Sequence, residues 1–204
     1  MAYDYSVLFA NIIAAVAGDG SFTERMHALI AHCEGQVPHQ DWERMRQADY
    51  EADSGAFERW LATSLAEGGP GASFKGLWFG LKNPVVGGQP TADIYVCAST
   101  TFEPGSLNWA VDSIFYPESG YLNSKVLAAV YRLAYSSDAA LRNDAEYPLA
   151  LAYGAMAART ALESACLSGP FADLDGAAAG FDGGDFLFLG SFRDGRFCAK
   201  VEAG

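Results

Sequence analysis

The fold is decided by residues 186–202, which read FLFLGSFRDGRFCAKVE. Strand-like runs lie on both sides of Asp194-Gly195. An Asp-Gly pair between two such runs is typical of a two-residue hairpin turn, because both turn positions require positive φ. The sequence therefore predicts an antiparallel hairpin with strands at 186–192 and 196–202.

Two further segments alternate with the period of a strand, residues 75–81 and 93–98. In the first, Trp78 lies on one side together with the glycines two residues before and after it. Those glycines predict that another part of the chain packs closely over this face. A third strand is expected at 109–113, where Trp, Val and Ser alternate with other residues.

The first third of the chain shows helical periodicity instead. Ser21, with Glu24 three residues later, forms a capping-box pattern at the start of one helix. The glycine-rich stretch 68–71 ends the helical region, and we place a subdomain boundary there. The helices expected in this part are at 7–16, from Ser21 to Cys33, a weaker one around Trp42 and Met45, and one from Ser54 to Leu65.

Two more helices are expected in the second half. Asn123 or Ser124 caps the first, and the second opens around Tyr147-Pro148, since proline is tolerated in a first turn. This second helix is apolar on nearly all sides to Ala158, so it should be buried. The order predicts an α+β fold: N-terminal helices followed by a mostly antiparallel sheet packed against two C-terminal-half helices. The expected units, 1–68 and 72–204, should form one compact body.

The charge of the chain restricts its partners. Against 13 Lys and Arg there are 25 Asp and Glu, a net charge of −12 over 204 residues. Binding of nucleic acid through phosphates needs clustered basic residues, and an anionic membrane surface repels such a protein. We therefore expect no nucleic acid and no membrane as partners. The charge suits a basic partner or a cationic ligand, or it serves solubility alone.

The cysteines and the N-terminus indicate a cytoplasmic protein. Cys33, Cys97, Cys166 and Cys198 are widely spaced and include no CxxC pair. Free thiols of this kind fit a reducing compartment. The N-terminus lacks the positive region of a secretory signal, and the apolar run 7–16 is too short to span a bilayer.

Motifs for metals, nucleotides and nucleophilic catalysis fail on spacing. His27 and His32 point about 140° apart on a helix, which disfavours a site with His39 or Cys33. The acidic stretches 173–176 and 182–185 lack the ligand spacing of a calcium loop and are expected to be solvated turns. No GxxxxGK[ST], GxGxxG or GxSxG motif is present in the needed context. We assign no cofactor, no metal site and no catalytic residue.

The best candidate site combines two polar, aromatic segments, 116–121 and 143–147, that precede helices. Both segments are expected at one end of the sheet. Three explanations fit: helix capping, a surface for a basic partner, and a small acid–base site. The residues proposed to bind a partner are Tyr116, Glu118, Tyr121, Asp144 and Glu146.

The leading functional hypothesis is a binding module that occludes a basic protein, as inhibitors of bacterial toxins (immunity proteins) do. The alternative is a small-molecule enzyme that uses carboxylate and tyrosine chemistry, with Glu118 or Asp144 as general base. A third hypothesis, a subunit of a larger assembly, requires Trp78 and Tyr95 to form an exposed apolar patch. No catalytic motif supports an enzyme, so binding is favoured.

Overall fold

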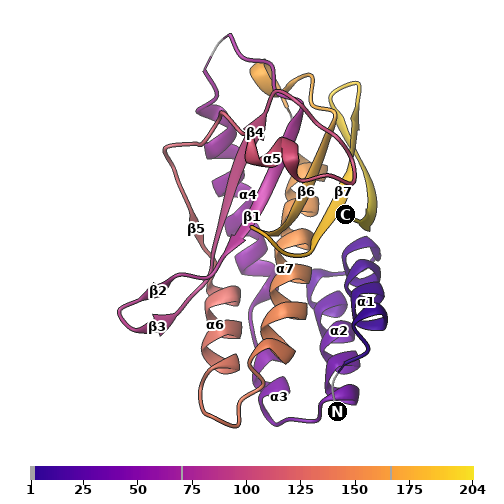
Figure 1. Cartoon of the computed structure of the whole chain (residues 1–204), viewed down its shortest axis with the longest axis vertical. Coiled ribbons are helices and arrows are strands. Elements are labelled where there is room, and N and C mark those ends of the chain that lie inside the picture. Colours follow the sequence, from indigo (N-terminus) through magenta and orange to yellow (C-terminus); the bar gives the residue numbers. More distant parts are fainter. Residues whose placement is uncertain (1–2, 70, 166) are drawn as a thin grey trace.

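The computed structural model describes residues 3–69, 71–165 and 167–204 (Figure 1). It confirms the α+β class. The helices are α1 (Tyr5–Ala17), α2 (Phe22–Gln36), α3 (Asp41–Arg46), α4 (Tyr50–Ala66), α5 (Asn108–Val111), α6 (Lys125–Ala134), α7 (Asn143–Ser164) and the 3-10 turn η1 (Gly169–Phe171). The strands are β1 (Gly76–Lys82), β2 (Val85–Val86), β3 (Gln89–Pro90), β4 (Asp93–Ser99), β5 (Leu122–Asn123), β6 (Gly176–Phe181), β7 (Phe186–Arg193) and β8 (Arg196–Ala203).

Among the described residues, six strands form one sheet in the order β5-β4-β1-β6-β7-β8. The central pair, β1 and β6, is parallel, with Gly76 opposite Gly176, and every other neighbouring pair is antiparallel. The predicted hairpin is confirmed as β7 and β8, and Asp194 and Gly195 take φ of 51° and 70°. Strand β6 has no counterpart among the predicted elements.

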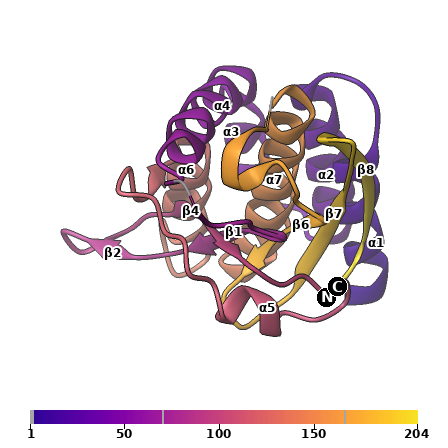
Figure 2. The ribbon, with the colours of Figure 1, turned by 90° about the horizontal axis from the view of Figure 1, so that it is seen from above.

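Helix α7 lies against one face of the sheet, and α1, α2, α4 and α6 surround it (Figures 1 and 2). Its side chains are buried almost without interruption from Ala145 to Ala158, as predicted. A Cβ on Gly154 would lie only 2.6 Å from Leu81 Cδ2, so this glycine lets α7 approach β1 closely. The main core between sheet and helices contains side chains from both sides of the 68–71 stretch.

The opposite face of the sheet carries a smaller core beneath α5. It comprises Trp78, Cys97, Trp109 and Ala178. A Cβ on Gly80 would lie 2.1 Å from the ring of Tyr95, so this glycine of β1 leaves room for a ring, as predicted. Trp78 is only 3% exposed. Its burial within the chain argues against the assembly-subunit hypothesis.

The predicted third strand at 109–113 is wrong. Residues 108–111 form the one-turn helix α5. The alternating pattern there does not reflect a common buried face, because Trp109 is buried while Val111 is 79% exposed. Trp109 instead anchors a covering segment over β1. The chain returns to the sheet only at Phe115, which forms an isolated bridge with Ala98.

The start of α7 also differs from the prediction. The helix begins at Asn143, so Pro148 lies inside it rather than in its first turn. Proline has no N–H to donate to the carbonyl four residues earlier, that of Asp144. The hydroxyl of Tyr3 donates to that carbonyl oxygen at 2.9 Å. This contact from the N-terminal segment satisfies the acceptor and allows the helix to continue through the proline.

Side-chain caps define the starts of α1, α2, α4 and α6. The capping box of Ser21 and Glu24 is present, and Ser124 caps α6, as predicted. Helix α4 begins at Tyr50 rather than near Ser54. The Asp49 carboxylate accepts from the N–H of Ala52, so the cap lies one turn earlier than the apolar pattern indicated.

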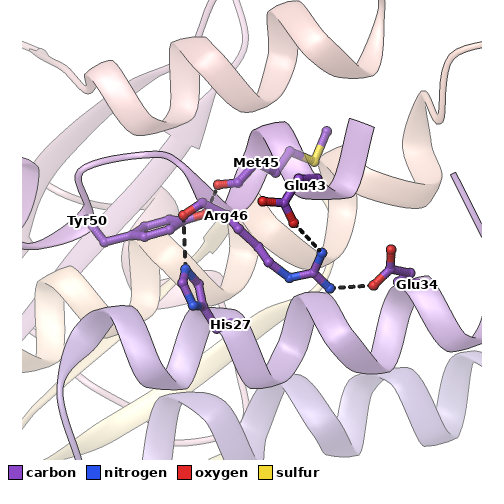
Figure 3. Close-up of polar contacts among 6 residues, drawn as sticks. All are labelled: His27, Glu34, Glu43, Met45, Arg46 and Tyr50. Atoms are coloured by element: carbon purple, nitrogen blue, oxygen red, sulfur yellow. Dashed lines mark hydrogen bonds and ion pairs between the residues drawn. The ribbon is translucent and has the colours of Figure 1, made fainter. Parts of the chain in front are cut away.

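Helix α3 is held against α2 by a polar cluster (Figure 3). The carbonyl of Arg46 lies 2.9 Å from His27 Nε2, and the Arg46 guanidinium pairs with Glu34 and Glu43. His27 therefore serves a structural contact. Within the described ranges, no group of three or more His, Cys, Asp and Glu side chains is placed to hold a metal ion.

The thiols differ sharply in accessibility, which gives a first prediction. Burial raises the pKa of Cys33 to about 12 and that of Cys97 to about 11, whereas Cys198 is exposed on β8. Only about one Cys97 in 1,000 is a thiolate at pH 8, and the thiolate is the reactive form. Iodoacetamide should therefore label Cys198 at least about 100-fold faster than Cys33 or Cys97, as measured by peptide mass spectrometry. Equal labelling of Cys97 and Cys198 in the folded protein would contradict the buried position of Cys97.

Candidate functional site

Two adjoining pockets lie at the end of the sheet where the parallel strands β1 and β6 finish. One has a volume of about 310 Å³ and the other about 480 Å³, and both are lined by Lys82 and Asp182. Lys82 ends β1 and Asp182 follows β6, and the parallel register of Leu81 with Phe181 brings these two ends together. The acidic groups that line the pockets are Glu146, Asp182 and Asp185, against one basic group, Lys82.

The smaller pocket is built from aromatic rings around a carboxylate. The Tyr95 hydroxyl donates to Asp182, and Trp78 Nε1 donates to the Tyr95 hydroxyl oxygen at 3.1 Å. Tyr121 packs edge-on against Tyr95 with ring centroids 5.9 Å apart. We call Lys82, Tyr95, Tyr116, Tyr121 and Asp182 the tyrosine–aspartate site.

The electrostatics of this site keep Tyr95 and Tyr116 neutral. Burial, and then the hydrogen bond to Asp182, raise the pKa of Tyr95 above its ordinary value of 10. Burial and the neighbouring Cys97 also raise the pKa of Tyr116. The ammonium of Lys82 lies 5.0 Å from the centroid of the Tyr121 ring, a cation–π contact. The site thus offers a carboxylate and aromatic faces, the two features that bind cations.

The larger pocket continues this pattern at the start of α7. The Tyr147 hydroxyl donates to Asp185 Oδ2 at 2.7 Å, and the Tyr147 ring stacks on Phe181. Glu146, which also lines this pocket, accepts a hydrogen bond from the hydroxyl of Tyr135. Burial, and then Glu146, raise the pKa of Tyr135 to about 12. Burial, and then the bond to Asp185, also raise the pKa of Tyr147, so each of the three tyrosine–carboxylate pairs at this end of the sheet has a neutral donor.

The segments 116–121 and 143–147 line these two pockets, the first the smaller and the second the larger. Tyr116 and Tyr121 are 60% and 54% exposed, and Glu118 is exposed on the same loop. Asp144 is half-buried, and Glu146 is only 8% exposed. Both acids lie in the first turn of α7, where they suit the helix dipole. Charge reversal at Glu146 would disturb a buried contact, so Glu118 is the better position for a binding test.

The sequence did not identify Lys82, Tyr95, Asp182 or Asp185 as site residues. The aspartates were assigned to a solvated turn, and Tyr95 was considered only as part of an apolar patch with Trp78. Their one available signal was position, because both Lys82 and Asp182 directly follow the last apolar residue of a strand. The parallel pairing that joins them is not visible locally, since β6 itself was missed.

None of the helices among the described residues is long and apolar enough to cross a membrane. The acidic stretch 182–185 forms the turn between β6 and β7. Comparisons with protein-family models, with curated proteins and with solved structures gave no match.

Proposed function

We propose that this protein is a binding module that occludes a basic protein partner, and that the tyrosine–aspartate site receives an Arg or Lys side chain of that partner. One observation carries the proposal: the Asp182 carboxylate lies among three tyrosines, two of which are more than half exposed. Tyrosine is enriched at the energetic centres of protein interfaces. An immunity protein or another cytoplasmic inhibitor would be a module of this kind.

Charge supports a cationic group as the occupant. The whole chain carries −12, so a basic protein is attracted over a long range and associates faster at low salt. At short range, Lys82 already places an ammonium over the Tyr121 ring. This internal cation marks a position that an incoming Arg or Lys can share or take over.

The site is also ordered before binding. Trp78, Tyr95 and Asp182 form a chain of hydrogen bonds, and Trp78 is held in the core beneath α5. Because these groups are already fixed, binding at this site costs less side-chain entropy than binding at a flexible surface. The exposed rings of Tyr116 and Tyr121 supply contact area with few rotatable bonds.

Two single substitutions with opposite expected effects test this proposal. The wild type and each variant are immobilised and exposed at moderate salt to lysate of the native host, and retained proteins are quantified by mass spectrometry. Asp182→Asn should lower retention of the basic partner at least about tenfold, because it removes the charge that pairs with the cation. Lys82→Met should raise retention, because it removes the internal competitor.

Asp19→Asn is the matched control, since it removes the same charge from an exposed position in the α1–α2 loop. It should leave retention nearly unchanged. Circular dichroism confirms that the exposed substitutions keep the fold. Equal retention by the wild type, Asp182→Asn and Glu118→Lys would exclude this end of the sheet as the binding surface.

An enzyme remains the alternative, and Glu146 is the observation that favours it. This carboxylate is buried, lines the 480 Å³ pocket and accepts from Tyr135, as a general base held by a neutral phenol would. Tyr147 and Asp185 would orient a small substrate beside it. A small molecule whose turnover is lost in Glu146→Gln, with no effect of Asp182→Asn on partner retention, would favour this function over the binding module.

A further inference from the structure

Strand β8 forms a long edge of the sheet. It is the last strand in the order and lies beside β7 at one side of the sheet (Figure 2). It runs over eight residues, whereas the opposite edge strand β5 has two. The pair beside the two-residue turn, Arg193 and Arg196, is hydrogen-bonded in such hairpins, and bonded and non-bonded pairs then alternate as far as Gly190 and Ala199. Phe197 and Ala199 therefore direct their N–H and C=O groups away from β7. An edge of this kind is a template for pairing with another strand.

The side chains of β8 are complementary to a second copy of the same strand. Beyond Ala199, β8 has a bulge of one extra residue before Glu202 pairs with Phe188. When residues are counted through this bulge, an antiparallel pair whose twofold axis passes Ala199 sets Phe197 opposite Val201 and Arg196 opposite Glu202. Phe197 and Val201 are half-buried and pack against the main core, so they share the helix side of the sheet. Arg196 and Glu202 are exposed and lie on the other side. The twofold axis therefore produces two apolar pairs and two opposite-charge pairs, both of which stabilise a sheet.

The charge of this region also favours contact between copies. Residues 186–204 contain three basic residues, Arg193, Arg196 and Lys200, and two acidic ones, Asp194 and Glu202, a net charge of +1. The whole chain carries −12, so two copies repel each other over most of their surface. Contact through the C-terminal hairpin keeps the strongly acidic parts apart. Ala199 and Cys198 at its centre are exposed, uncharged and small.

We infer that two copies of this protein pair through β8, antiparallel around Ala199, so that their sheets join into one. The interface is isologous, and it closes after two copies because each edge is used once. The tyrosine–aspartate site lies on β1, β4 and the β6–β7 turn, so it stays open in the dimer. A dimer then presents two such sites and can bind a repeated or dimeric basic partner with avidity.

A cysteine at the twofold axis tests the register. Ala199→Cys in a Cys198→Ser background places two thiols opposite each other, with Cα atoms about 5.5 Å apart, which is within the range of a disulfide. Mild oxidation should convert most of the protein to a covalent dimer. Ala203→Cys in the same background is the control, because that residue is exposed on the same strand but about 26 Å from its copy, eight rises of about 3.3 Å. Equal cross-linking of both variants overturns the register.

Charge exchange tests the pairing without a cross-link. Light scattering after size exclusion should give the mass of two chains for the wild type. Glu202→Lys sets like charges opposite each other and should weaken the dimer at least about tenfold, and the double variant Arg196→Glu with Glu202→Lys should restore it. A wild type that is monomeric up to about 100 μM overturns the inference, because this concentration is well above the dissociation constant of a stable dimer. Partner retention by Asp182→Asn is measured separately, so failure of one proposal is distinguishable from failure of the other.

Discussion

Replacing Asp53 with alanine is expected to lower the free energy of unfolding by about 4 kcal/mol. Asp53 lies on α4, is 7% exposed and joins three helices. Its carboxylate accepts from the Ser124 hydroxyl at 2.5 Å, from the Tyr153 hydroxyl at 2.6 Å and from the backbone N–H of Lys125 at 3.0 Å. The substitution leaves these buried donors without an acceptor, and each such group costs about 1–3 kcal/mol.

Urea unfolding followed by tryptophan fluorescence measures this loss. Asp49→Ala is the matched control, because Asp49 lies one turn earlier on the same helix but is exposed and caps a single N–H. It should lower the free energy of unfolding by about 1 kcal/mol. Asp53→Asn keeps the size and one acceptor oxygen, so its effect should lie between the two. If Asp53→Ala destabilises the protein no more than Asp49→Ala does, the buried contact does not hold the three helices together.

The second large effect is loss of stability at alkaline pH. Burial raises the pKa of Tyr50, Tyr131 and Tyr153 above the ordinary value of 10. Because the folded-state pKa is raised, the stability that these groups contribute is fully present below pH 10. It is lost as pH rises above 10, since the unfolded chain releases the protons first. These three groups alone give a slope of about −4 kcal/mol per pH unit above pH 10, and the other tyrosines with a raised pKa, such as Tyr95 and Tyr135, make it steeper.

The free energy of unfolding should therefore be nearly flat from pH 8 to pH 9.5 and then fall steeply. Unfolding and the tyrosinate absorbance of these three phenols should appear together, because they ionise only when the chain opens. Tyr131→Phe removes one of the three groups and should reduce the slope by about 1.4 kcal/mol per pH unit. Tyrosinate absorbance that rises fully while the fold persists would contradict the burial of these hydroxyls.

Local signals predicted much of the fold. The Asp194-Gly195 turn, the capping box at Ser21 and the change of period at 75–81 each depend on a few neighbouring residues, and each is confirmed. The buried course of α7 followed from the same kind of pattern. These features share one property: the residues that stabilise them lie close together in the sequence.

Strand β6 shows what local patterns miss. Its sequence, GAAAGF, lacks the β-branched residues typical of strands and resembles a flexible loop. Small residues are needed there because the strand is buried on both faces: a Cβ on Gly176 would lie 2.4 Å from the ring of Phe102. The same long-range packing brings Lys82 to Asp182. The sequence therefore located two segments of the candidate site, 116–121 and 143–147, but not the carboxylate between its tyrosines.

The parallel pairing of β1 with β6 has a consequence for synthesis of the chain. Gly76 pairs with Gly176, 100 positions further on, so the centre of the sheet stays open until residues 176–181 have left the ribosome. Before that moment β1 and β4 can form a hairpin, but the inner side of β1 is an unpaired edge. The nascent chain must therefore keep this edge from other chains while about half of the protein is still being made. Strand β6, with five small residues followed by Phe181, completes the sheet, and with it the site at the end of β1.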